Sequence, residues 1–162
     1  MIRAATPGDV PTILQLIREL ARYEKLLEEA VATEDQIRSS LFGPGGARAE
    51  VLLAEAAGDG GGRVVGFALF FHNYSTFLGR QGLYLEDLFV LPEHRRKGYG
   101  RALLSELARL ARERGCGRFE WAVLDWNEPA LKVYRRLGAR AQQEWTIHRI
   151  TGAALEALAA KL

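Results

Sequence analysis

The sequence predicts an α/β fold in which one mixed, mostly antiparallel sheet carries helices on both faces. Three strand-like segments, at residues 50–57, 63–74 and 83–90, follow one another through short connections and are expected to pair antiparallel. Farther along, strand-like segments alternate with amphipathic helical segments, an order typical of α/β sheets. The chain has 162 residues, so a single domain over residues 1–162 is expected.

Apolar spacing and turn residues predict the N-terminal elements. A short strand at residues 2–5 precedes a helix that begins at Pro11 and ends near Lys25. Five apolar residues of that helix recur at helical spacing, namely Ile13, Leu14, Ile17, Leu20 and Ala21. Thr33 followed by Gln36 has the form of a capping box and opens a second, short helix. The glycine-rich segment 58–62 predicts a hairpin with a flexible tip.

The second half of the chain predicts two strand-helix units and a closing helix. A helix ending at Gly115 has an apolar stripe formed by Leu103, Leu104, Leu107, Leu110 and Ala111. A strand at residues 119–124 and a helix at residues 128–137 follow. Residues 139–150 are expected to be extended with a break near Gln143, and residues 153–162 to form an alanine-rich helix.

Composition excludes several classes of protein. Hydrophobic residues make up 48% and charged residues 26% of the chain, which is typical of a globular domain. A net charge of +2 is too small to predict nucleic-acid binding, and no apolar run is long enough to span a membrane. The single cysteine, Cys116, and the absence of a signal-peptide pattern favour the cytoplasm. The three histidines lack partners at ligand spacing, so no metal is expected.

A basic, glycine-containing loop follows the strand at residues 83–90. It consists of Arg95, Arg96, Lys97, Gly98, Tyr99 and Gly100. Glycines allow close approach of a ligand to the backbone, and the N–H groups at the start of the next helix attract anions. The loop therefore predicts a diphosphate site, although a glycine-rich turn with a solvated basic face explains these six residues equally well.

The wider sequence around this loop resembles a known enzyme superfamily. Arg95, Gly98 and Gly100 match the Arg/Gln-x-x-Gly-x-Gly/Ala signature of the GCN5-related N-acetyltransferases (GNAT). The chain is also similar over essentially its whole length to the diamine acetyltransferases, which include spermidine/spermine and thialysine acetyltransferases. The segments that resemble this family are LIRELARYEK, VVGFALFFHNYST, LYLEDLFV, AVLDWNEPALKVYRRLGA and the late Trp145.

The resemblance implies the GNAT acyl-CoA N-acyltransferase fold, with the central sheet splayed around acetyl-CoA. It places the pantetheine arm along Leu88, Phe89 and Val90, and the diphosphate on the loop from Arg95 to Gly100. It also implies that Asn127 hydrogen-bonds the cosubstrate. Tyr134 would serve as the general acid that protonates the CoA sulfur, whereas composition alone favours a tyrosine that packs in the core.

The resemblance also implies where an acceptor amine binds. Glu86 and Asp87 match a Glu-Asp pair, and our hypothesis is that Glu86 accepts the amine proton while Asp87 holds the substrate chain. Because side chains alternate along a strand, only one of them is expected to face a given side. A solvent-facing pair or partners for nearby arginines are the alternatives. Tyr23, Glu24 and Trp145 match family positions that contact the acceptor.

These residues predict a cytoplasmic enzyme that transfers an acetyl group from acetyl-CoA to a primary amine by direct attack in a ternary complex. Ser75-Thr76-Phe77 stands where polyamine-specific members have Asp-Pro-Trp, which favours thialysine, a lysine analogue or a short diamine over spermidine or spermine. An acceptor with a carboxylate would need a cation, for which Arg80 is a candidate. Protein N-acetylation and a non-catalytic acyl-CoA-binding module are the remaining alternatives. The resemblance further implies a homodimer.

Overall fold

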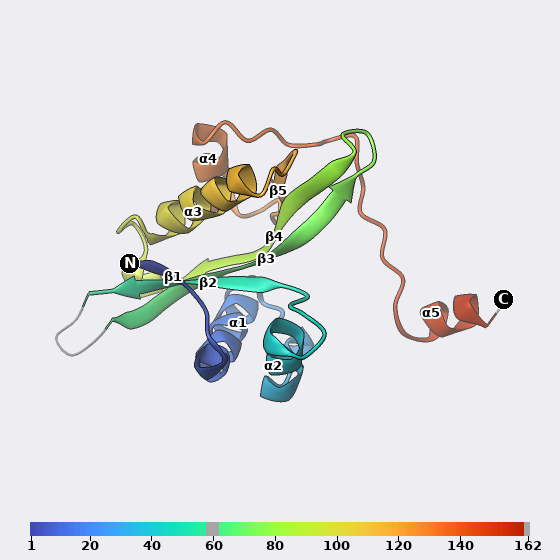
Figure 1. Cartoon of the computed structure of the whole chain (residues 1–162), viewed down its shortest axis with the longest axis horizontal. Coiled ribbons are helices and arrows are strands. Elements are labelled where there is room, and N and C mark those ends of the chain that lie inside the picture. The colour runs from blue at the N-terminus through green and yellow to red at the C-terminus, as the bar shows by residue number, and fades with distance from the viewer. Residues whose placement is uncertain (58–61, 161–162) are drawn as a thin grey trace. The chain divides into compact units, whose positions relative to one another are not determined.

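The computed structural model describes residues 1–57 and 62–160, and its centre is a five-stranded sheet in the order β1-β2-β3-β4-β5 (Figure 1). Neighbouring strands are antiparallel from β1 to β4, and β5 pairs with β4 in parallel. The sheet is therefore mixed and mostly antiparallel, as predicted. Its strands are β1 (Ile2–Ala4), β2 (Glu50–Ala56), β3 (Arg63–Ser75), β4 (Arg80–Val90) and β5 (Phe119–Trp121).

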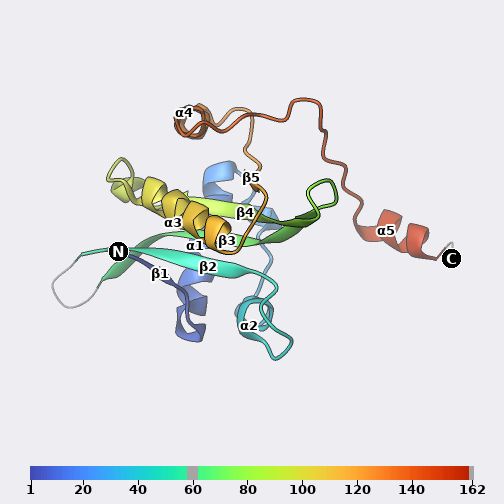
Figure 2. The ribbon, with the colours of Figure 1, turned by 45° about the horizontal axis from the view of Figure 1, so that its top comes forward.

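Helices cover both faces of this sheet. Helices α1 (Val10–Glu24) and α2 (Glu34–Phe42) lie on one face, and α3 (Tyr99–Glu113) lies on the other (Figures 1 and 2). Three short 3-10 helices occupy the connections at Pro7–Asp9, Leu27–Glu29 and Pro92–His94. None of the described helices combines the length and the apolar character needed to cross a membrane.

The chain divides into two compact units, residues 1–122 and residues 123–162. The first contains the sheet and helices α1 to α3. The second contains α4 (Glu128–Arg136) and α5 (Gly152–Ala159), and the described residues between them form neither helix nor strand. A turn at Gln143 and Glu144 interrupts this segment where the sequence predicted a break.

Local sequence determines where the helices begin and end. The Thr33 hydroxyl accepts a hydrogen bond from the Gln36 N–H (3.3 Å), and the Gln36 side chain accepts one from the Thr33 N–H (2.9 Å), which completes the predicted capping box. Helix α1 ends at Lys25, which adopts a left-handed φ of 63° while Leu26 N–H bonds back to Ala21 (2.8 Å). Gly115, also left-handed, follows α3.

The face of the sheet under α1 and α2 holds a continuous apolar core. Its strand residues are Val51 and Leu53 from β2, Phe67 from β3 and Phe89 from β4. The helices contribute Ile13, Leu16, Leu20 and Leu41 to the same core. Burying these large side chains is the main favourable contribution to folding of this layer. The packed core consequently fixes the C-terminal half of β4 relative to α1.

A β-bulge interrupts β4 in its middle. Phe70 pairs with Leu85 and Leu69 pairs with Asp87, so Glu86 is an extra residue with no partner in β3. Pairing with β5 also stops here, since Leu85 opposite Trp121 is its last pair. The predicted strand at residues 119–124 is therefore shorter than expected, because β5 loses its partner where β4 bulges. Beyond Leu85, no described strand pairs with this edge of β4.

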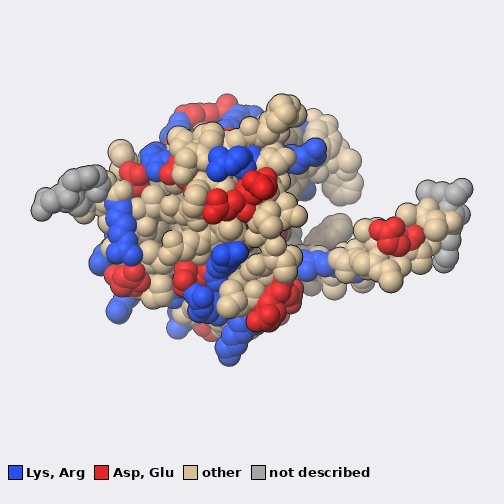
Figure 3. All heavy atoms as spheres, turned by 90° about the horizontal axis from the view of Figure 1, so that it is seen from below, with Lys and Arg blue, Asp and Glu red and all other residues tan. Residues whose placement is uncertain are grey.

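Two further expectations from the sequence concern the hairpin tip and the distribution of charge. The predicted flexible hairpin tip falls mostly on residues 58–61, which lie outside the described residues, as do the last two residues of the predicted closing helix. On the face that carries α1 and α2, acidic and basic side chains lie side by side (Figure 3). That distribution agrees with the small net charge of +2.

Candidate active site

Three carboxylates gather at the bulge of β4. Glu86 is exposed and Asp87 is half-buried, whereas Glu24 comes from the last turn of α1. The charges of Glu86 and Glu24 both act on the Asp87 carboxylate, so each of them lies within electrostatic reach of Asp87. The bulge interrupts the alternation expected of a regular strand. Hence the premise that Glu86 and Asp87 must face opposite sides does not hold here.

This environment makes Asp87 an unusually weak acid. Burial, together with the neighbouring charges of Glu86 and Glu24, raises the pKa of Asp87 to about 6. Burial also raises the pKa of Glu24. A site that disfavours negative charge in this way gains stability when a cation enters it. Strong perturbation by burial together with specific charged neighbours is typical of functional carboxylates.

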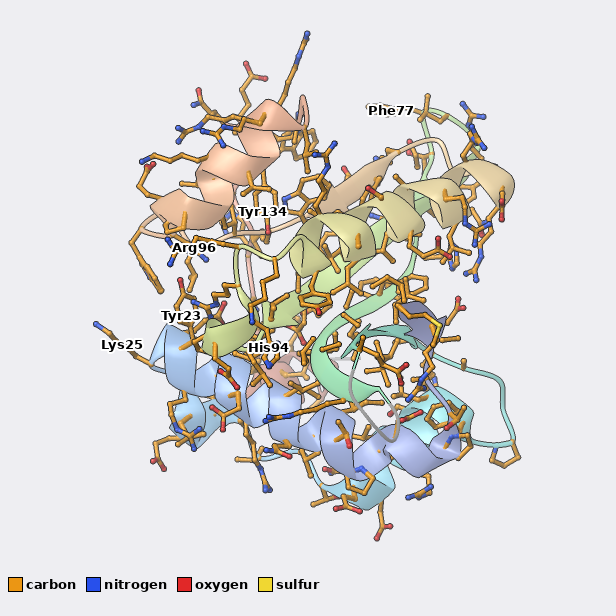
Figure 4. All side chains as sticks on the ribbon, turned by 90° about the vertical axis from the view of Figure 1, so that its left-hand side faces the viewer. Tyr23, Lys25, Phe77, His94, Arg96 and Tyr134 are labelled. Atoms are coloured by element: carbon orange, nitrogen blue, oxygen red, sulfur yellow. The ribbon has the colours of Figure 1, made fainter. Side chains whose placement is uncertain are left out.

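Arg95 connects the end of α1 to the end of β4. Its guanidinium carbon lies 4.4 Å from the centre of the Tyr23 ring and 5.5 Å from that of Phe89. Its Nε donates a hydrogen bond to the Val90 carbonyl (3.0 Å). Figure 4 shows Tyr23 in the last turn of α1 and Arg96 in the loop after β4. The side chain of Arg95 thus stacks on aromatic rings, which the signature pattern alone does not indicate.

The outer edge of β4 offers backbone groups in the stretch predicted to bind pantetheine. Leu91 N–H donates to the Val65 carbonyl (2.9 Å), so the peptide groups of Leu91 face β3. Peptide groups of alternate residues in an antiparallel ladder face the same neighbour. Phe89 consequently faces β3, while the peptide groups of Leu88 and Val90 point away from it. Of the three predicted residues, these two present their backbone to a ligand on that edge.

The basic loop ends at the N-terminus of α3. Gly98 has a φ of 90°, which glycine adopts without strain, and Arg96 has a φ of 61°. The first helical hydrogen bond runs from Ala102 N–H to the Gly98 carbonyl (2.9 Å), so the preceding N–H groups have no helical acceptor. Arg96 and Lys97 are exposed beside them. This combination of free N–H groups and cations suits an anion such as a diphosphate.

The second unit contains the remaining predicted site residues. Asn127 is the N-cap of α4, and its side-chain oxygen accepts a hydrogen bond from Ala130 N–H (3.4 Å). Asn127, Leu131 and Tyr134 are all half-buried, and their spacing places them on one side of the helix. Burial raises the pKa of Tyr134, so its phenol keeps its proton at neutral pH. Trp145, in contrast, is 77% exposed.

Comparison with known proteins identifies the family. The sequence matches the Acetyltransferase (GNAT) family over residues 14–139. The chain therefore belongs to the GNAT family and is an acetyltransferase. The solved structure of an integron cassette protein from the mobile metagenome of Vibrio cholerae has the same fold, with a TM-score of 0.78 and 27% identity over 98% of this chain and 96% of that one.

Two characterised relatives extend over nearly the whole chain. Thialysine N-epsilon-acetyltransferase from Sus scrofa is 40% identical, over 99% of this chain and 98% of the relative. L-ornithine N5-acetyltransferase from Arabidopsis thaliana is 36% identical, over 97% of this chain and 86% of the relative. The names of both relatives specify an amino acid that is acetylated on its side-chain amine.

The raised pKa of Asp87 predicts a pH-dependent stability. Between the ordinary value of 3.8 and about 6, the folded state binds more protons than the unfolded state, so the free energy of unfolding falls as pH rises through this range. Asp87→Asn removes the ionisable group and with it this fall in the free energy of unfolding. We expect the variant to be more stable than the wild type at neutral pH by on the order of 2 kcal/mol. Urea unfolding of both proteins at several pH values measures the difference.

Glu144→Gln is the matched control, because Glu144 is an exposed carboxylate in the second unit. Its stability should follow that of the wild type at every pH. Parallel curves for Asp87→Asn and the wild type would contradict the proposed environment of Asp87.

Proposed function

We propose that this protein acetylates the distal primary amine of a small molecule, namely thialysine, ornithine, a lysine analogue or a short diamine, with acetyl-CoA as the acyl donor. The observation that carries the proposal is the cluster of Glu24, Glu86 and Asp87 next to the unpaired edge of β4. The substrates named for the two relatives support the same acceptor class.

The acidic cluster suits an amine acceptor for two reasons. A free alkylamine has a pKa of about 10.4 and reaches the enzyme as a cation, so it must be bound and then deprotonated. Carboxylates do both. The sequence favoured Glu86 as the proton acceptor. The pKa of about 6 favours Asp87 in that role, because a general base is most effective when its pKa lies near the working pH. Glu86 and Glu24 then hold the cation.

Acetyl-CoA fits two features of the first unit. The peptide groups of Leu88 and the N–H of Val90 can bond the pantetheine arm as a neighbouring strand would, whereas the Val90 carbonyl already accepts from Arg95 Nε. The loop from Arg95 to Gly100 can hold the diphosphate at the start of α3. Asn127 and the exposed cations Arg96 and Lys97 complete the set of residues that we propose to bind acetyl-CoA. Bound acetyl-CoA supplies a thioester, whose carbon–sulfur bond breaks as the amine nitrogen bonds to the acetyl carbon.

The departing thiolate needs a proton, and we assign this role to Tyr134. Its raised pKa keeps the phenol protonated at neutral pH, so that a proton is available when the thiolate leaves. Direct attack by the amine is favoured over an acyl-cysteine intermediate. Cys116 follows the C-terminal end of α3, whereas the anion loop lies at its N-terminal end, and a helix of 15 residues is about 22 Å long.

Three further features belong to this proposal. The GNAT match over residues 14–139 extends across both compact units, which supports a single functional domain.

Trp145 and Ile147 are 77% and 74% exposed, and covering them with a second copy of the chain would form the homodimer that the family resemblance implies. The cytoplasmic location, expected from the lone cysteine, remains a prediction.

Thiol release from acetyl-CoA tests the proposal directly. The purified protein is assayed with thialysine, ornithine, lysine, putrescine, spermidine and a peptide with a free N-terminus. We expect the highest kcat/KM for one of the short amines. A preference for spermidine would indicate a polyamine acetyltransferase, and a preference for the peptide a protein acetyltransferase. No thiol release with any of these amines, despite binding of acetyl-CoA, would reject catalysis on amines.

Variants of the two β4 carboxylates separate their roles. If Asp87 accepts the proton, Asp87→Asn should lower kcat by about 100-fold or more and remove the ionisation near pH 6 from the pH profile of kcat/KM. Glu86→Gln should mainly raise KM for the amine, because it removes one of the charges that hold the cation. The reverse pattern would return the role of base to Glu86.

Tyr134→Phe tests the proposed acid. Loss of the phenol proton should lower kcat by about 100-fold, with little change in the Kd for acetyl-CoA, because the hydroxyl acts on the leaving group. Isothermal titration provides the Kd and stopped-flow thiol detection the rate. Tyr74→Phe is the control, since Tyr74 is 62% exposed on β3. Equal turnover in Tyr134→Phe and the wild type would exclude the role.

A further inference from the structure

A second polar cluster lies on the same face of the sheet as the acidic site. On β3, Phe67 and Leu69 pack in the core under α1, and the alternation of the strand carries Phe71 and Asn73 onto that face. Tyr84 of β4 is opposite Phe71, with ring centres 5.2 Å apart. Glu120 of β5 is in turn opposite Tyr84, so the face continues to the last strand.

The cluster is built around an ion pair between Arg118 and Glu120. Arg118 Nε lies 2.7 Å from Glu120 Oε2, but the direction of its N–H does not allow a hydrogen bond between these two atoms. The same Glu120 oxygen accepts a hydrogen bond from Asn73 Nδ2 (2.9 Å), and Arg118 Nη2 donates to the Tyr74 carbonyl (3.3 Å). Both charged side chains are 36% exposed. The pair is therefore accessible, and neither group has all of its hydrogen-bonding capacity used.

Gly82 creates the space that this cluster needs. A Cβ atom at this buried position would lie 2.4 Å from Asn73 Oδ1 and 2.9 Å from Arg118 Cγ. Only glycine therefore allows Asn73 and Arg118 to meet Glu120 across β4. Asn73 Oδ1 itself is buried and has no hydrogen-bond partner among the described residues. Arg80 lies two residues before Gly82 on the same strand, so it shares this face.

Tyr84 joins the cluster to the proposed acceptor carboxylates. The charges of Glu86 and Glu120 both contribute to raising the pKa of Tyr84, so its phenol lies near both groups. Glu86 follows Tyr84 by two residues, about 6.6 Å along the strand, and Glu120 lies one strand away, about 4.8 Å to the side. An extended acceptor of ornithine or lysine length can span this separation.

We propose that Arg118 and Glu120 bind the amino-acid head of the acceptor, while its distal amine reaches Glu86 and Asp87. This inference rests on the proposed function. Glu120 pairs with the α-ammonium group, and Arg118 pairs with the α-carboxylate. An amino-acid head carries the opposite charges side by side, so it can exchange partners with the existing ion pair and leave no charge unpaired.

The same pair disfavours long polyamines. A polyamine has ammonium groups but no carboxylate, so Arg118 would face a cation of like charge instead of an anion. Arg118 is thus the first cation that the acceptor carboxylate meets, in the role for which Arg80 was a candidate. Arg80 is exposed nearby and adds positive charge to the same face. Selection of an amino acid then comes from Arg118 and Glu120, at the start of β5, and not from a carboxylate in the loop at Ser75 to Phe77.

Three acceptors that differ by one group test this assignment. Ornithine has both head groups, putrescine lacks the carboxylate, and δ-aminovalerate lacks the α-amino group. Arg118→Met should lower the ratio of kcat/KM for ornithine to that for putrescine by about 10- to 100-fold, the value of one charge-assisted hydrogen bond. Glu120→Gln should lower the ratio of ornithine to δ-aminovalerate by a similar factor. Ratios within one protein are unaffected by a partial loss of folded enzyme.

Glu106→Gln and Arg109→Met are matched controls, because Arg109 and Glu106 form an exposed ion pair of the same chemistry on α3 (2.6 Å). Both ratios should stay at their wild-type values in these variants. If Arg118→Met and Glu120→Gln also keep the wild-type ratios while ornithine is still acetylated, the head-group assignment is wrong and the proposed function stands. If the wild-type protein acetylates none of the three acceptors, the proposed function is rejected together with the inference.

Discussion

The bulge at Glu86 is the constraint on which the rest of the site depends. It inserts one residue into β4 between the pairs Phe70–Leu85 and Leu69–Asp87. Pairing with β5 ends at the same place, which leaves the outer edge of β4 without a strand partner in the described structure. One backbone irregularity therefore interrupts the strand at the two carboxylates, and the end of pairing beside it exposes peptide groups that a cosubstrate can use. Bulges are common next to active sites for this reason.

Electrostatics then separates the site into an anionic and a cationic end. Burial and the charges of Glu86 and Glu24 together raise the pKa of Asp87, so an ionised Asp87 is unfavourable there without a cation. Arg95 is close enough to stack on Tyr23, the residue before Glu24, but its Nε bonds to the Val90 carbonyl. Because rings and a backbone oxygen hold this guanidinium, it does not neutralise the carboxylates. They remain available to a cationic acceptor.

Much of this arrangement could be predicted from the sequence. The antiparallel pairing of β2, β3 and β4, the end of α1 near Lys25 and the capping box at Thr33 depend on local patterns, and each agrees with the structure. Two adjacent carboxylates in an apolar strand were the only local sign of the bulge. The sequence did not predict the cluster of Asn73, Arg118 and Glu120. The hydrogen bond from Asn73 to Glu120 joins residues 47 positions apart, and it depends on the space that Gly82 leaves on the strand between them. The stacking of Arg95 depends likewise on α1, far away in sequence.

The two groups that we propose for proton transfer have complementary states at neutral pH. Asp87, with a pKa of about 6, is mostly ionised at pH 7 and can accept a proton, whereas Tyr134, with its pKa raised above the ordinary value of 10, still carries one to donate. Burial is the largest cause of both pKa shifts. In the proposed mechanism Asp87 must be ionised before the reaction, whereas Tyr134 must still carry its proton. The pH range between the two values is therefore the range in which base and acid are both ready, and an amine acetyltransferase that works near neutrality requires that range.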